Sequence, residues 1–161
     1  ITKCPNELSE KKKKEYIKEI NPRKDQKIYF SKINYKGVFN LKNEQKKDVP
    51  ENIILITGIA KPQAILDKFS NSNIKHLKYP DHYRFKDPDI KEISEIFDSF
   101  AEENKIILTT LKDLMRLRLF KSFCEKYENE IHYLDISIEI DRETEFLEGI
   151  INYVEENKGD Y

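Results

Sequence analysis

Asp81 and His82 are the side chains whose types and spacing most clearly suggest chemistry. They follow the β-forming stretch 74–79 after a single proline, Pro80. An imidazole titrates near neutral pH and can hold or pass a proton, and a carboxylate beside it can bias its charge. The pair predicts a proton-handling site. A surface histidine in a proline-flanked turn, with Asp81 capping the turn, accounts for the same residues without a ligand.

Thr110 and Lys112 form a second candidate, just after the β-forming stretch 106–108. Thr110 and Asp113 have the spacing of a helix capping box, which explains Asp113 structurally. Lys112 is not explained in this way, because a cation in the first turn of a helix opposes the helix dipole. A nearby phosphate or carboxylate would offset that cost. We therefore predict that Lys112, with Thr110, binds substrate or phosphate.

Gly58 is the third candidate, between the apolar stretch 53–57 and a helical pattern. A glycine lets a ligand approach the backbone, and the N–H groups of a following helix can bind an anion. A tightly packed strand-to-helix turn explains Gly58 equally well. We include it among the predicted phosphate-binding residues.

The elements that must position these residues alternate from residue 52 onward. Strands are predicted over 53–57, 74–79, 106–108 and 131–136, and helices over 62–69, 87–100, 114–127 and 146–154. Asp87 is the predicted N-cap of the second helix. This alternation predicts an α/β fold, an open and mostly parallel sheet flanked by helices in three Rossmann-like layers. Since the carboxyl ends of parallel strands share one edge, the segments at Gly58, Asp81 and Thr110 should meet at one rim.

The first 50 residues follow a different pattern. A helix is predicted after an N-cap at Ser9, ending at Asn21 and Pro22, followed by extended segments 28–30 and 33–39 that break near Gly37. A polar linker over 41–51, with Pro50 near its end, comes next. The expected division is therefore residues 1–50 as the end of one domain plus a linker, and 51–161 as an α/β domain.

Composition excludes several classes of function. The 161 residues carry 29 basic and 30 acidic side chains, a net charge of -1, so no overall field favours nucleic acid. Cys4 and Cys124 lack metal-ligand spacing, as do the three histidines, so no metal site is predicted. No run approaches the roughly 20 apolar residues of a membrane helix.

Three segments in order, Thr57-Gly-Ile-Ala-Lys-Pro62, Tyr79-Pro-Asp-His-Tyr-Arg-Phe85 and Thr109-Thr-Leu-Lys-Asp113, resemble the C-terminal half of the tetraacyldisaccharide 4'-kinases. These are the lipid A 4'-kinases of Gram-negative bacteria. The stretches 1–5 and 29–31 resemble segments that precede that half, so the resemblance covers nearly the whole chain. One departure is Leu111, where the family usually has glutamate.

The resemblance implies transfer of the γ-phosphate of ATP, with Mg²⁺, to the 4'-hydroxyl of a tetraacyldisaccharide 1-phosphate. It implies that His82, beside Asp81, is an active-site histidine that assists a carboxylate of the other domain in activating that hydroxyl. Thr2 and Lys3 lie where P-loop proteins often place a nucleoside-contacting strand end. The implied partners are a glycolipid substrate and the enzyme's own N-terminal P-loop domain.

The chain contains no Gly-x-x-x-x-Gly-Lys-Ser/Thr run. By the resemblance, ATP and Mg²⁺ are held mainly by an upstream half, residues 1–50 include the end of that nucleotide-binding domain, and this chain is a fragment that is inactive alone. The N-terminal region would also contact the membrane, placing the whole enzyme on the cytoplasmic face of the inner membrane.

The main alternative is a free-standing flavodoxin-like or receiver-like module that binds phosphate or a partner. A receiver needs acidic residues after its first strand, where this chain has Gly58-Ile59-Ala60. A small dinucleotide-binding domain is disfavoured because Gly-x-Gly-x-x-Gly is absent.

Overall fold

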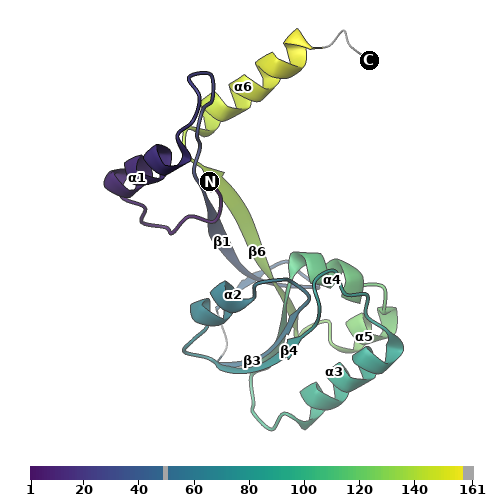
Figure 1. Cartoon of the computed structure of the whole chain (residues 1–161). Helices are drawn as coiled ribbons and strands as arrows, with labels where there is room; N and C mark the ends of the chain where they lie inside the picture. The colour runs from purple at the N-terminus through teal and green to yellow at the C-terminus, as the bar shows by residue number, and fades with distance from the viewer. Residues whose placement is uncertain (49–50, 158–161) are drawn as a thin grey trace. The chain divides into compact units, whose positions relative to one another are not determined.

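A mixed six-stranded sheet runs through the computed structural model, which describes residues 1–48 and 51–157 (Figure 1). The strand order is β2-β1-β6-β5-β3-β4. Strands β4, β3, β5 and β6 pair in parallel, and β2 pairs antiparallel with β1. The strands are β1 (Ser31–Asn40), β2 (Lys46–Lys47), β3 (Asn52–Thr57), β4 (Asn73–Lys78), β5 (Lys105–Thr110) and β6 (Ile131–Ile140). The predicted α/β class, with a mostly parallel sheet flanked by helices, is confirmed.

Six helices accompany the strands in the described part of the chain. They are α1 (Glu10–Ile20), α2 (Gln63–Lys68), α3 (Asp87–Ser99), α4 (Leu111–Leu117), α5 (Lys121–Lys126) and α6 (Glu143–Glu156). The predicted ends of α1 are confirmed: Ser9 Oγ accepts the Lys12 N–H, and Asn21 takes the left-handed conformation that ends the helix.

Several predicted boundaries are wrong. The N-cap of α3 is Lys86 rather than Asp87, because the Asp89 carboxylate accepts the Lys86 N–H at 2.7 Å. The helix predicted over 114–127 is two short helices, α4 and α5. Strand β1 continues through Gly37, and the predicted linker contains β2. Pro50 lies outside the described residues.

The chain forms two compact units, Ile1–Tyr35 with Ile136–Tyr161, and Lys36–Asp135. Their bounds differ from the expected division at residue 50, since the C-terminal segment joins the N-terminal one. Compact units need not coincide with the domains of a family, so the expected domains, 1–50 and 51–161, stay a prediction.

The core of the unit Lys36–Asp135 is built on β3 and β5. Both strands are almost continuously buried, as expected of parallel strands covered on both faces. Side chains of α3, α4 and α5 pack with Ile54, Ile56 and Ile107 in one apolar cluster. Burying each such side chain stabilises the fold by about 1.5–3 kcal/mol. This rigid core fixes the loops that follow β3, β4 and β5.

Helix α6, in the unit Ile1–Tyr35 with Ile136–Tyr161, forms where its apolar spacing predicts. The apolar row on α6 is nevertheless exposed: Leu147, Ile150, Ile151 and Val154 are each 46–55% accessible. No residue of α6 is buried against the described part of the chain.

Candidate active site at the sheet rim

A fully buried carboxylate, Asp113, connects the ends of two strands. Its oxygens accept hydrogen bonds from the Gly58 backbone N–H at 2.9 Å, the Thr110 hydroxyl at 2.8 Å and the Arg116 guanidinium at 2.9 Å. Thr110 Oγ1 also accepts the Asp113 N–H at 3.1 Å, so the predicted N-cap is confirmed. The aspartate fastens the loop after β3 to the first turn of α4.

Gly58 is a glycine because of this close approach. A Cβ at this position would lie 2.9 Å from Asp113 Oδ1 and 3.4 Å from the Pro80 carbonyl oxygen. The carboxylate and the Pro80 loop thus occupy the space of a side chain. This is the tight-packing explanation of Gly58, and its expected role in phosphate binding stays a prediction.

The loop after β4 brings His82 to the same place. The His82 N–H donates to the Gly58 carbonyl at 3.3 Å and to Asp81 Oδ1 at 3.0 Å. His82 has a φ of 60°, in the left-handed region that few non-glycine residues occupy. Such a conformation costs free energy and is found preferentially at functional sites.

An aromatic cluster supports this loop. The Tyr79 ring stacks on Tyr83 at 5.0 Å and meets the edge of Phe85 at 5.0 Å. Burial, with the nearby Glu92 and Asp89 carboxylates, raises the pKa of Tyr79 to about 12. Its phenol therefore stays protonated at neutral pH and is a packing group rather than a base.

The side chains of Lys112 and Arg116 flank the imidazole of His82. Lys112 Nζ lies 3.3 Å from Asp81 Oδ1 and 3.4 Å from His82 Nε2, and an Arg116 terminal nitrogen lies 3.5 Å from His82 Nδ1. A neutral imidazole has one lone pair to offer, so it can accept from only one of the two cations at a time. The structure thus brings the predicted residues together at one rim: Gly58, Asp81, His82, Thr110 and Lys112.

Electrostatics keep Asp81 ionised in this cluster. Partial burial acts to raise the pKa of Asp81, but the hydrogen bond and charge of Lys112 and the neighbouring His82 outweigh it and leave the pKa below its ordinary value. The His82 side chain is 73% exposed, so a substrate can reach its ring. The rim thus presents an accessible imidazole between two cations that are each paired with a carboxylate, Lys112 with Asp81 and Arg116 with Asp113. An anionic group bound there would have to share or replace these ion pairs.

Arg116 is the site residue absent from the predicted set. It is one turn beyond Lys112 and spans Asp113 and His82, with its side chain 22% exposed. The i,i+3 spacing of Asp113 and Arg116 on one helix face is the sequence signal that indicates it.

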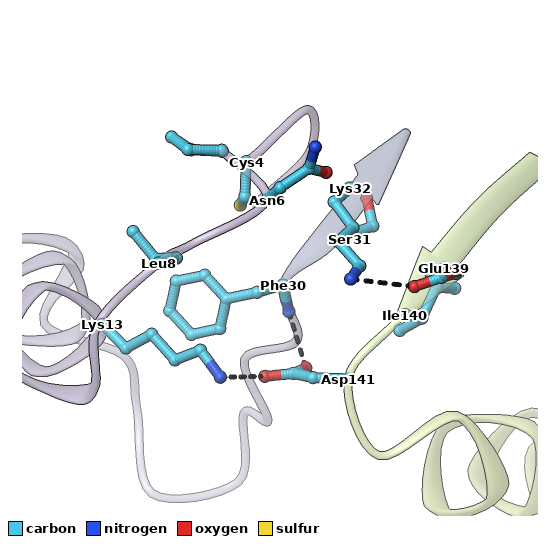
Figure 2. Close-up of a pocket in the computed structure, with 11 residues that line it drawn as sticks. Cys4, Asn6, Leu8, Lys13, Phe30, Ser31, Lys32, Glu139, Ile140 and Asp141 are labelled. Carbon is cyan, nitrogen blue, oxygen red and sulfur yellow. Dashed lines mark hydrogen bonds and ion pairs between the residues drawn. The ribbon is translucent and has the colours of Figure 1, made fainter. Parts of the chain in front are cut away.

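Thr2 and Lys3, predicted to contact nucleotide, lie in the other compact unit. They directly precede Cys4, which lines a cavity of about 300 Å³ (Figure 2). The lysines of that cavity are already paired: Lys13 with Asp141 at 3.3 Å and Lys32 with Glu139 at 3.0 Å. The cavity has no obvious unpaired cation for a phosphate, and the nucleotide role of Thr2 and Lys3 stays a prediction.

In the described ranges, 1–48 and 51–157, no three His, Cys, Asp or Glu side chains gather as a metal site would require. No helix there is long and apolar enough to cross a membrane.

Comparison with known proteins gives consistent matches along the chain. It is 33% identical to a tetraacyldisaccharide 4'-kinase of Bacteroides thetaiotaomicron, covering 98% of this chain and 46% of that protein. It is 32% identical to one of Flavobacterium johnsoniae, covering 98% and 44%. It thus spans somewhat less than half the length of these relatives.

Two further comparisons concern structure and family. A crystal structure of LpxK from Aquifex aeolicus, an "apo" form in complex with ATP, is 18% identical with a TM-score of 0.48, covering 81% of this chain and 37% of that one. The family model described as tetraacyldisaccharide-1-P 4'-kinase matches residues 4–155. With nearly its whole length matched, the chain belongs to the tetraacyldisaccharide-1-P 4'-kinase family.

Proposed function

We propose that this chain is the C-terminal portion of an ATP-dependent lipid kinase that phosphorylates the 4'-hydroxyl of a tetraacyldisaccharide 1-phosphate in lipid A biosynthesis. The observation that carries the proposal is the convergence of His82, Asp81 and Lys112 at one rim, in a chain of this family. A free-standing phosphate-binding module has no comparable support, because the family match runs along nearly the whole chain.

In this proposal the imidazole of His82 handles the proton of the acceptor hydroxyl. Its exposed ring can orient the hydroxyl and, with a carboxylate of the other domain, favour loss of its proton. Asp81 fixes the loop by accepting the His82 N–H and holds Lys112 by a charged hydrogen bond. Bound ATP with Mg²⁺ would supply the phosphoryl group.

Lys112 and Arg116 have the complementary role of binding negative charge. Both are cations within 3.5 Å of the imidazole, so an anionic group held by them lies next to the proton-handling ring. Thr110 and Gly58 position Arg116, because both donate to the Asp113 carboxylate that also binds Arg116. Electrostatic stabilisation and positioning are the main contributions that proteins make to phosphoryl transfer.

The remaining parts of the enzyme are proposed to come from a further domain. We assign to it the P-loop, most contacts to ATP and Mg²⁺, and the contact with the inner face of the inner membrane. The exposed apolar row of α6 suits burial against that domain. The glycolipid acceptor would then be shared between the two.

Two observations test the division of roles. A Gly-x-x-x-x-Gly-Lys-Ser/Thr run encoded upstream of Ile1 is expected, and its absence from the coding sequence would contradict the proposal. The purified 161-residue chain, given ATP, Mg²⁺ and the disaccharide acceptor, should show no turnover. Rates near those of ordinary kinases, roughly 1–100 s⁻¹, would show that the chain needs no P-loop domain.

The role of His82 is tested in the enzyme that includes this chain. His82→Ala should lower kcat by about 10²–10⁴-fold, as expected for loss of a group in proton transfer, and leave ATP affinity unchanged. Arg84→Ala is the matched control, since Arg84 is exposed in the same loop. If His82→Ala keeps full kcat, or if circular dichroism shows that the variant is unfolded, His82 has a structural role and not a catalytic one.

A further inference from the structure

A second polar cavity, of about 190 Å³, lies in the unit Lys36–Asp135. It is formed by the segment from the end of β1 to β2 and by the turn that enters β6. This is the amino end of β6, whereas the rim site follows the carboxyl ends of β3, β4 and β5. Its lining residues are Asn40, Asn43, Gln45, Lys46, Lys47, Asn129 and His132.

Asn40 builds the walls of this cavity. Its side-chain NH₂ donates to the carbonyls of Glu128, Asn129 and Ile131 at 3.0–3.3 Å. Its Oδ1 accepts the N–H groups of Lys42 and Asn43 at 2.9 and 3.3 Å. One buried amide therefore fixes both sides of the cavity, so its shape belongs to the fold.

His132 is the buried polar group that lines it. The residue is 1% exposed, and its Nδ1 lies 2.8 Å from the Glu130 carbonyl oxygen. A carbonyl only accepts, so Nδ1 carries a hydrogen and the neutral ring has its lone pair on Nε2. Within residues 1–48 and 51–157, every fully buried polar side-chain atom has a hydrogen-bond partner. His132 Nε2 has no partner among these residues, so this atom is not fully buried. Nε2 is therefore the ring atom open to the cavity.

The charged residues that line the cavity are all positive. The lining includes two lysines and no carboxylate. Neither Lys46 nor Lys47 forms an ion pair with a described residue, in contrast to the lysines of the cavity in Figure 2. The aliphatic part of the Lys46 side chain packs over Gly37. A Cβ added to Gly37 would lie 2.7 Å from Lys46 Cε.

We propose that this cavity is a binding site for a hydrogen-phosphate group, either free phosphate or the singly ionised form of a phosphate monoester. One P–OH donates to His132 Nε2, and the anionic oxygens accept from the Lys47 ammonium and from side-chain amides of the lining. Asn43 suits this role because its Oδ1 already accepts the Gln45 N–H, leaving its NH₂ to donate. The same O···H···N contact forms whether the proton resides on the phosphate or on the ring.

The groups that face His132 make the choice of anion specific. Burial first, and then the charge of Lys47, lower the pKa of His132, while the Glu130 carbonyl and carboxylate act in the opposite sense. Lys46 adds positive charge, and the nearby Glu128 is neutralised by its ion pair with Lys42. The ring is therefore neutral at pH 7 and needs a ligand that brings its own proton. Sulfate, fully ionised at pH 7, cannot do so.

The test follows the imidazole nitrogens of the ¹⁵N-labelled chain by NMR at pH 7, during titration with inorganic phosphate at constant ionic strength. The His132 Nε2 signal should shift and saturate, with the His82 signals reporting separately on the rim. Lys47→Gln should raise the Kd measured at His132 about tenfold, as expected for loss of one charge-assisted hydrogen bond. Lys75→Gln, at an exposed position of β4, should match wild type.

Further titrations separate the sources of the ligand. A phosphate monoester has a second pKa of about 6 and is mostly doubly ionised at pH 7, so glycerol phosphate is compared with inorganic phosphate at equal concentrations of the forms that carry a P–OH. If glycerol phosphate then shifts His132 as inorganic phosphate does, the site accepts a monoester; if only inorganic phosphate does, its ligand is the free ion. Sulfate should bind only as the pH falls below the ordinary histidine value of 6.5. Absence of a saturable shift at His132, an unchanged Kd in Lys47→Gln, or sulfate binding as tight as phosphate at pH 7 would overturn the proposal.

Discussion

The fully buried carboxylate of Asp113 accepts a hydrogen bond from the backbone N–H of Gly58 at 2.9 Å, across 55 residues of sequence. The same carboxylate binds Thr110 and Arg116. The loop that carries His82 is hydrogen-bonded to the Gly58 carbonyl. One buried charge therefore sets the geometry of groups that lie at the exposed rim.

Asp113→Asn should destabilise the protein. The amide keeps the size of the carboxylate but loses the charge that three donors share, leaving the partly buried Arg116 without its counter-ion. We expect the free energy of unfolding to fall by about 2–4 kcal/mol, measured by urea denaturation. Asp87→Asn, at an exposed position of α3, is the control and should change it little. Equal stability of both variants would contradict the anchoring role of Asp113.

Gly58→Ala tests the close approach at the rim. The new methyl would lie 2.9 Å from Asp113 Oδ1 and 3.4 Å from the Pro80 carbonyl oxygen, so the backbone or the aspartate must move. We expect a loss of about 1–3 kcal/mol of unfolding free energy. Gly149→Ala in α6 is a sharp control, because nothing lies within 4 Å of its Cβ. That variant should gain about 0.5–1 kcal/mol, so the two alanines are predicted to act with opposite signs.

The convergence at the rim follows from the sequence because the carboxyl ends of parallel strands lie along one edge of a sheet. Alternating β and α segments place the loops after β3, β4 and β5 together. The apolar character of β3 and β5 is strong enough to predict their burial. The N-cap of α4 is equally local, since Thr110 and its N3 residue are three positions apart.

Other features depend on contacts that no local pattern encodes. The hydrogen bond between Asp113 and Gly58 joins segments far apart in the sequence. Asp113, which the sequence explains as part of a helix cap, therefore also holds the loop after β3 in place. His76, which has no evident partner in the sequence, bonds Thr57 Oγ1 at 2.8 Å. The break between α4 and α5 has no proline or glycine to indicate it.

Lys112→Ala should separate anion binding from proton transfer. Loss of the ammonium removes one of the two cations beside His82 and lets the pKa of Asp81 rise toward its ordinary value. In the enzyme that includes this chain, we expect KM for the anionic acceptor to increase about tenfold, with a smaller change in kcat. His82→Ala should instead lower kcat, with a smaller change in KM. An unchanged KM in Lys112→Ala would remove the lysine from the binding site.

The stability of the chain should fall as the pH is lowered from 7 toward 5.5. Burial is the main cause that lowers the pKa of both His76 and His132 below 6.5, with Lys78 and Lys47 adding to it. The unfolded state therefore binds more protons in this window, and the free energy of unfolding decreases as the pH falls through 6.5. Urea denaturation in phosphate-free buffer measures this slope, because phosphate would bind at His132. A His76→Gln, His132→Gln double variant should flatten it, and each single variant should flatten it in part. A wild-type protein more stable at pH 5.5 than at pH 7 would show that neither imidazole is held neutral by the fold.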